Sequence, residues 1–165
     1  MWKADYAKEK FRLFGLLVTM EHEQNHYSWW TATVDGFYLA RAAATFGDAK
    51  GNYEQVLPDL EHGFRITRDW VGGGFDPQAV AKAELSWWVA RRIRGQDSPE
   101  HVGSLMADSY ALMYEVPRAD MITAATLRAQ AGKLRDDEAT NPDWTTINTL
   151  LRQSYRSLHA ALAAR

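Results

Sequence analysis

The chain contains no cysteine among its 165 residues. Disulfide bonds, thiolate-bound metals and cysteine nucleophiles are therefore excluded, and the composition suits a reducing compartment. An excess of one charge is also missing, since the formal net charge is −2 at pH 7. A chain so close to neutral has no general electrostatic attraction for nucleic acid or for an anionic membrane. We expect neither of these as a partner.

Long apolar runs are missing as well. The longest one near the amino terminus, Leu16-Leu17-Val18, is far shorter than the roughly 20 residues that a membrane-spanning helix needs. The first residues have neither the basic start nor the continuous apolar stretch of a signal peptide. We therefore expect a soluble, cytoplasmic protein.

The composition is that of a folded domain, with 46% hydrophobic and 24% charged residues. A chain of this length can bury a sizeable core. We expect a single domain over residues 1–165. The glycine triplet that begins at Gly72 is the clearest interruption of the chain, and it predicts a sub-boundary near residues 72–76.

Apolar residues recur with a helical period, and no segment alternates as a strand does. Three segments combine a capping residue with the proline that often begins a helix: Asp76-Pro77, Ser98-Pro99 and Asn141-Pro142. We expect an all-α bundle of six or seven helices, or alternatively two helical-hairpin halves. The predicted helices cover about residues 5–33, 37–46, 53–71, 77–94, 99–115, 118–135 and 143–164. Asp35-Gly36, a turn-type dipeptide, predicts a break or kink between the first two of these helices.

His22, Glu23 and His26 form an H-E-x-x-H sequence. On a helix, residues four positions apart share one face with Cβ atoms roughly 6 Å apart, so two imidazoles can bind one zinc ion. Over this short motif the chain resembles the zincin metalloproteases. The resemblance implies zinc as the cofactor, His22 and His26 as ligands, and Glu23 as the general base that activates a metal-bound water.

A catalytic zinc needs a third protein ligand. Glu84 is our first choice, because it lies two residues before Ser86-Trp87-Trp88, just as His26 lies two residues before Ser28-Trp29-Trp30. A site built from histidines alone would instead resemble the DinB-like metal-binding bundles. The competing interpretation is that His22 and His26 are core residues, hydrogen-bonded to buried groups.

Tryptophan is unusually frequent, with seven residues in this small chain. Four of them form the adjacent pairs Trp29-Trp30 and Trp87-Trp88. Neighbours on a helix point about 100° apart, so one narrow buried stripe cannot accommodate both members of a pair. We expect at least one member of each pair to lie outside the central core. Three arginines follow the second pair, and the predicted binding surface is Trp29, Trp30, Trp87, Trp88, Arg91 and Arg92.

Two functional hypotheses follow. The first is a binding or interaction module for a protein or small-molecule partner, which includes self-association into a homo-oligomer. The second is a metal-binding helical bundle, with zinc-dependent hydrolysis at residues 22–26. Base rates favour the first, because the sequence does not identify the third metal ligand.

Overall fold

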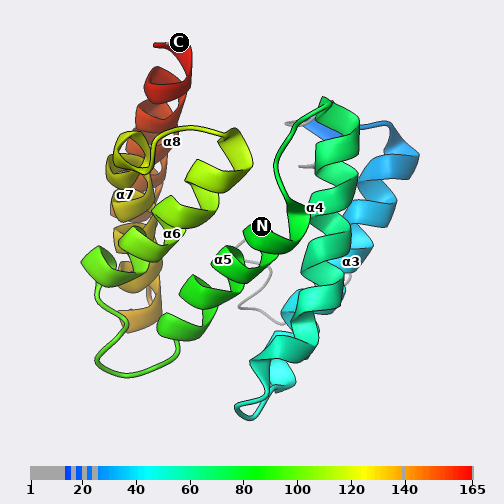
Figure 1. Cartoon of the computed structure of the whole chain (residues 1–165). Coiled ribbons are helices and arrows are strands. Elements are labelled where there is room, and N and C mark those ends of the chain that lie inside the picture. The colour runs from blue at the N-terminus through cyan, green and yellow to red at the C-terminus, as the bar shows by residue number, and fades with distance from the viewer. Residues whose placement is uncertain (1–13, 16–17, 20–21, 24–25, 139, 165) are drawn as a thin grey trace. The chain divides into compact units, whose positions relative to one another are not determined.

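A computed structural model describes residues 14, 15, 18, 19, 22, 23, 26–138 and 140–164. This part of the chain is largely helical and contains no strand, so the predicted all-α class is confirmed (Figure 1). No helix within it is long and apolar enough to cross a membrane. Its elements are α3 (Trp29–Asp48), the short 3₁₀ helix η1 (Tyr53–Val56), α4 (Leu57–Val71), α5 (Pro77–Ala90), α6 (Pro99–Tyr114), α7 (Arg118–Asp137) and α8 (Trp144–Ala163).

The chain divides into two compact units, unit 1 (Met1–Ala81) and unit 2 (Lys82–Arg165). The division lies inside α5, a little after the sub-boundary predicted near residues 72–76. Gly72 ends α4 in the left-handed conformation, with φ at 68°, where glycine avoids the cost that a side chain would incur. Whether the two units fold together as a single domain stays a prediction.

Unit 1 is built on the packing of α3 against η1 and α4. Ser28 caps the start of α3, where its hydroxyl accepts a hydrogen bond from the Thr31 amide at 3.1 Å. Gly63 of α4 lies against Asp35 of α3, and a Cβ added at Gly63 would come within 3.1 Å of Asp35 Oδ1. The absence of a side chain at Gly63 therefore allows the two helices to approach closely.

The predicted helix break at Asp35-Gly36 is wrong. Helix α3 runs through both residues, and the interruption instead lies at residues 26–28, before the Ser28 cap. Gly36 is buried, and a Cβ there would lie 3.1 Å from Cγ2 of Val18. This glycine therefore serves close packing rather than a turn, a distinction that a dipeptide preference cannot make.

Unit 2 contains α6, α7 and α8, with α7 packed against both of the others. The cap prediction for α6 is confirmed, because the Ser98 hydroxyl accepts a hydrogen bond from the His101 amide at 3.2 Å. Helix α5 ends at Ala90, earlier than predicted. The chain then turns toward Gly95, whose φ of 89° is incompatible with a continued helix.

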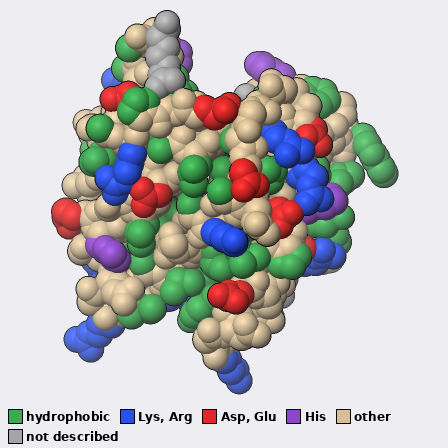
Figure 2. All heavy atoms as spheres, viewed as in Figure 1, with side chains coloured by type: hydrophobic (Ala, Val, Ile, Leu, Met, Phe, Trp, Pro, Cys, Tyr) green, Lys and Arg blue, Asp and Glu red, His purple; other side chains and the backbone are tan. Residues whose placement is uncertain are grey.

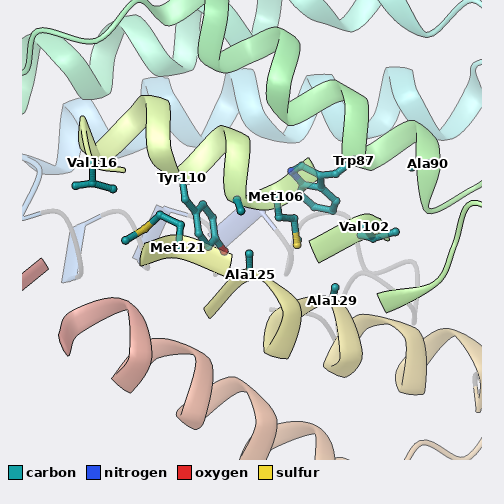
Figure 3. Close-up of a cluster of buried hydrophobic side chains, with 10 residues drawn as sticks. Trp87, Ala90, Val102, Met106, Tyr110, Val116, Met121, Ala125 and Ala129 are labelled. Carbon is teal, nitrogen blue, oxygen red and sulfur yellow. The ribbon is translucent and has the colours of Figure 1, made fainter. Parts of the chain in front are cut away.

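One hydrophobic cluster forms the core of unit 2. Figure 3 shows its side chains, which come from α5, α6, α7 and the connection between α6 and α7. Gly103 marks the closest approach of α6 to α7, since a Cβ there would lie 2.6 Å from the Cα of Thr126. The cluster consists of Trp87, Ala90, Val102, Met106, Ala107, Tyr110, Val116, Met121, Ala125 and Ala129.

Candidate functional site

The H-E-x-x-H residues do not share one helix face. His22 and Glu23 are helical, whereas His26 lies outside any helix, with a positive φ of 54° and an exposed side chain. The prediction of zinc ligation assumed that both histidines lie on one face of a continuous helix, and this segment does not have that geometry. Among the described residues, no group of three or more histidine or acidic side chains is arranged to hold a metal ion.

His22 is held by local contacts. Its Nδ1 lies 2.6 Å from the carbonyl oxygen of Tyr27, to which the protonated nitrogen donates. Its ring stacks on the indole of Trp29, with centroids 3.9 Å apart and planes inclined by 22°. These contacts bring His22 against the start of α3 and give it a structural role there. Zinc binding by His22 and His26 stays a prediction.

Glu84, the predicted third ligand, belongs to unit 2, whereas His22 and His26 belong to unit 1. Its Oε1 accepts a hydrogen bond from Trp88 Nε1 at 3.1 Å, and its Oε2 accepts one from the Ser109 hydroxyl at 2.9 Å. The carboxylate therefore joins α5 to α6. It provides a hydrogen-bond acceptor for two donors that are buried or partly buried.

The two tryptophan pairs occupy different environments. Trp29 and Trp30 are 58% and 77% exposed at the start of α3. A hydrophobic side chain projects at the right edge of Figure 2, where the first turn of α3 lies in Figure 1. Trp87 is only 8% exposed and belongs to the core of unit 2, whereas Trp88 is half-buried at its edge. At least one tryptophan of each pair is thus not fully buried.

The two predicted arginines follow the end of α5. Arg91 is half-buried, and its Nε donates to Asp136 Oδ2 at 2.7 Å, which ties the segment to α7. Arg92 is exposed. Of the predicted binding surface, Trp29, Trp30 and Arg92 are thus exposed, whereas Trp87 is a core residue and Arg91 is engaged in an ion pair.

Sequence reasoning missed Arg128, on α7. Its guanidinium interacts with the phenol of Tyr110, and its charge is also influenced by Glu84 and by Tyr155 from α8. A signal was present in the sequence, because Arg128 lies three and four residues after Ala125 and Ala124, both of which are buried. An arginine at that spacing lies on the face that α7 turns toward its neighbours.

The tyrosines around Arg128 have shifted pKa values. Burial raises the pKa of both the Tyr110 and Tyr114 hydroxyls above the ordinary value for tyrosine, while the positive charge of Arg128 acts in the opposite direction. The pKa of Arg128 is raised in turn, chiefly by Tyr110, although burial lowers it. At neutral pH the cluster therefore holds one guanidinium cation and neutral phenols that can donate hydrogen bonds.

The chain matches no family model, and neither a curated protein nor a solved structure is significantly similar to it.

Proposed function

We propose that this chain is an interaction module that binds through the outward face of α3, and that its partner is a second copy of the same chain. The observation that carries the proposal is the exposure of two large aromatic side chains on this face. Trp30 is 77% exposed and Phe37 is 48% exposed. They are seven residues apart, so they point in nearly the same direction from the helix. Exposed aromatics grouped in this way are typical of protein interfaces.

The side chains on this face become smaller toward the end of α3. Ala44 is exposed and follows Phe37 by a further seven residues. In an antiparallel pair of α3 helices related by a two-fold axis at Phe37, the large Trp30 of each copy lies over the small Ala44 of the other. A two-fold interface uses the same patch on both copies, so a face that runs from large to small residues is complementary to itself.

The charges of this face also suit an antiparallel pair. Arg41 Nε donates to Asp59 Oδ2 at 2.7 Å, and its guanidinium carbon lies 5.2 Å from the centre of the Phe37 ring. The cation of this face is therefore already paired within its own chain. Asp48 at the end of α3 would lie near the start of the partner's α3, where the helix dipole attracts an anion.

Association through one helix face is expected to be modest. A standard interface buries about 1,600 Å² in total, and a single pair of helices buries less than that. We therefore expect a Kd on the order of 1 μM or higher. The module would be a monomer when dilute and a dimer when concentrated.

The absence of cysteine allows a direct test, because one introduced thiol reports on one position. Phe37→Cys places the thiols of two copies at the proposed axis, so mild oxidation should convert the protein rapidly to a covalent dimer. Ala43→Cys is the matched control, since Ala43 is also exposed on α3 but points about 120° away from Phe37. Equal cross-linking of the two variants, or none in Phe37→Cys, would remove the proposal.

A further inference from the structure

Several cations of unit 2 form ion pairs with a carboxylate, whereas Arg128 forms none with a described residue. Arg91 and Lys133 have carboxylate oxygens at 2.7 Å and 2.8 Å, and Arg118 and Arg135 also form ion pairs. Arg128 has no carboxylate within ion-pair distance in the described part of the chain, although it is cationic and partly buried. A buried charge is normally paired, so an unpaired one requires an explanation.

The donors around Arg128 are not saturated by the protein. The Nε atom of Arg128 is buried and has no hydrogen-bond acceptor among the described residues. The same holds for Nε1 of Trp87, a side chain that is more than nine-tenths buried. Figure 3 shows the nitrogen-bearing edge of this indole turned toward the side on which Tyr110 lies. Arg128 interacts with the same tyrosine, and Trp87 and Tyr110 belong to one hydrophobic cluster.

The edge of the cluster reaches the protein surface. Tyr114 and Tyr155 are 37% and 51% exposed, and both influence the groups around Arg128. Glu84, the nearest countercharge, is held by its bonds to Trp88 and Ser109. Its negative charge stabilises the Arg128 cation electrostatically, but the two side chains form no ion pair.

We propose that Arg128, Tyr110 and Tyr155 form a binding site for a small organic carboxylate with an aromatic or apolar body. The guanidinium has five N–H donors in a planar fork that matches a carboxylate, and the tyrosine hydroxyls add further donors. The tyrosine rings supply an apolar wall for the rest of the ligand. This site lies wholly within unit 2, so it is independent of the association proposed for α3.

Benzoate is a suitable probe, and benzamide is its neutral control of nearly the same shape. A buried arginine Nε–H group gives its own NMR signal, which we would follow while each compound is added at pH 7. Benzoate should shift the Arg128 signal in a saturable way, with a Kd on the order of 1 mM, as expected for a fragment of this size. Benzamide should bind at least tenfold more weakly. Inorganic phosphate should also bind more weakly, because it gains nothing from the aromatic wall.

Two variants separate binding from folding. Arg128→Gln should abolish the benzoate-dependent shifts of the neighbouring tyrosine signals. Tyr155→Phe removes one hydroxyl from a half-exposed side chain, should leave the fold intact, and should weaken benzoate at least threefold. If Arg128→Gln does not fold, Tyr155→Phe decides the matter alone. The inference is overturned if wild-type protein shows no saturable response to benzoate, if benzamide binds equally well, or if Tyr155→Phe binds benzoate unchanged.

Discussion

The two Ser-Trp-Trp segments use the same three residues in opposite ways. Ser28 precedes a helix and caps it, which leaves the tryptophans on the first turn of α3, where both are exposed. Ser86 lies inside α5, where its hydroxyl donates to the Ala83 carbonyl oxygen at 2.6 Å, and Trp87 is buried. The position of the serine relative to the helix start therefore decides whether the aromatics reach the solvent or the core.

This difference extends to the units that contain the segments. Unit 2 collects its large side chains in one cluster that includes Trp87 and Tyr110. Unit 1 has a cluster around Tyr27 and also buries Val56 and Leu60. Both units leave large hydrophobic side chains exposed, and Trp30 of unit 1 is the most exposed of those described. We infer that the difference lies in the aromatics: Trp87 stabilises the core of unit 2, whereas Trp30 and Phe37 of unit 1 remain available to a partner.

The largest expected effect is a contrast between tryptophans. Trp87→Ala should lower the free energy of unfolding by about 3–5 kcal/mol, because it removes a buried aromatic and leaves a cavity. Trp30→Ala should change it by no more than about 0.5 kcal/mol, as most exposed substitutions do. Urea unfolding at low protein concentration would measure both. Similar losses in the two variants would refute the assignment of one tryptophan to the core and the other to the surface.

The contact of α6 with α7 offers the next test. Gly103→Ala should destabilise the protein by about 1–3 kcal/mol, because the added methyl group meets the backbone of Thr126. Gly47→Ala is the control, since a Cβ there meets no neighbouring atom within 4 Å and Gly47 lies within α3. It should stabilise the protein by about 0.5–1 kcal/mol through helix propensity. A neutral Gly103→Ala would mean that the two helices are farther apart than described.

The two serines should respond differently to the same substitution. Ser28→Ala removes the cap of α3 and should lower stability by about 1 kcal/mol. Ser86→Ala should be within about 0.5 kcal/mol of wild type, since alanine is favoured in a helix interior and the lost bond is local. Thermal unfolding of both variants would compare them. An equal loss in both would show that Ser28 has no special role at the helix start.

The smallest expected effect concerns metal content. Because His26 does not share a helix face with His22, we expect substoichiometric zinc in protein prepared without a histidine tag. His22→Ala should then lower stability through the loss of its stacking on Trp29, without changing the metal content. Elemental analysis would decide between the interpretations. Stoichiometric zinc that both His22→Ala and His26→Ala remove would restore the zinc hypothesis and place these residues at a metal site.

Local signals predicted much of the fold. The capped starts before Pro77 and Pro99 both precede helices, because these signals depend only on neighbouring residues. Gly36 was misread, since its role depends on Val18 packing against it, and such a contact leaves no trace in a dipeptide.

The site was harder to predict than the fold. Arg128 becomes informative only once it is seen beside Tyr110 without a carboxylate partner, and these relations join separate helices. The sequence does indicate that the two members of each tryptophan pair cannot both be buried in one stripe of a helix. The helix boundaries were needed to assign each pair to the core or the surface. Trp29 lies at the start of α3, whereas Trp87 lies inside α5.

Sedimentation equilibrium of the purified chain tests the proposed function most directly. Wild-type protein should pass from monomer to dimer as its concentration rises through the micromolar range, whereas a variant that carries both Trp30→Ala and Phe37→Ala should remain monomeric with unchanged helical circular dichroism. Ile122→Ala, which truncates an exposed side chain of α7, should dimerise like the wild type. A wild-type chain that stays monomeric at high concentration, or a double variant that still dimerises, would contradict the account.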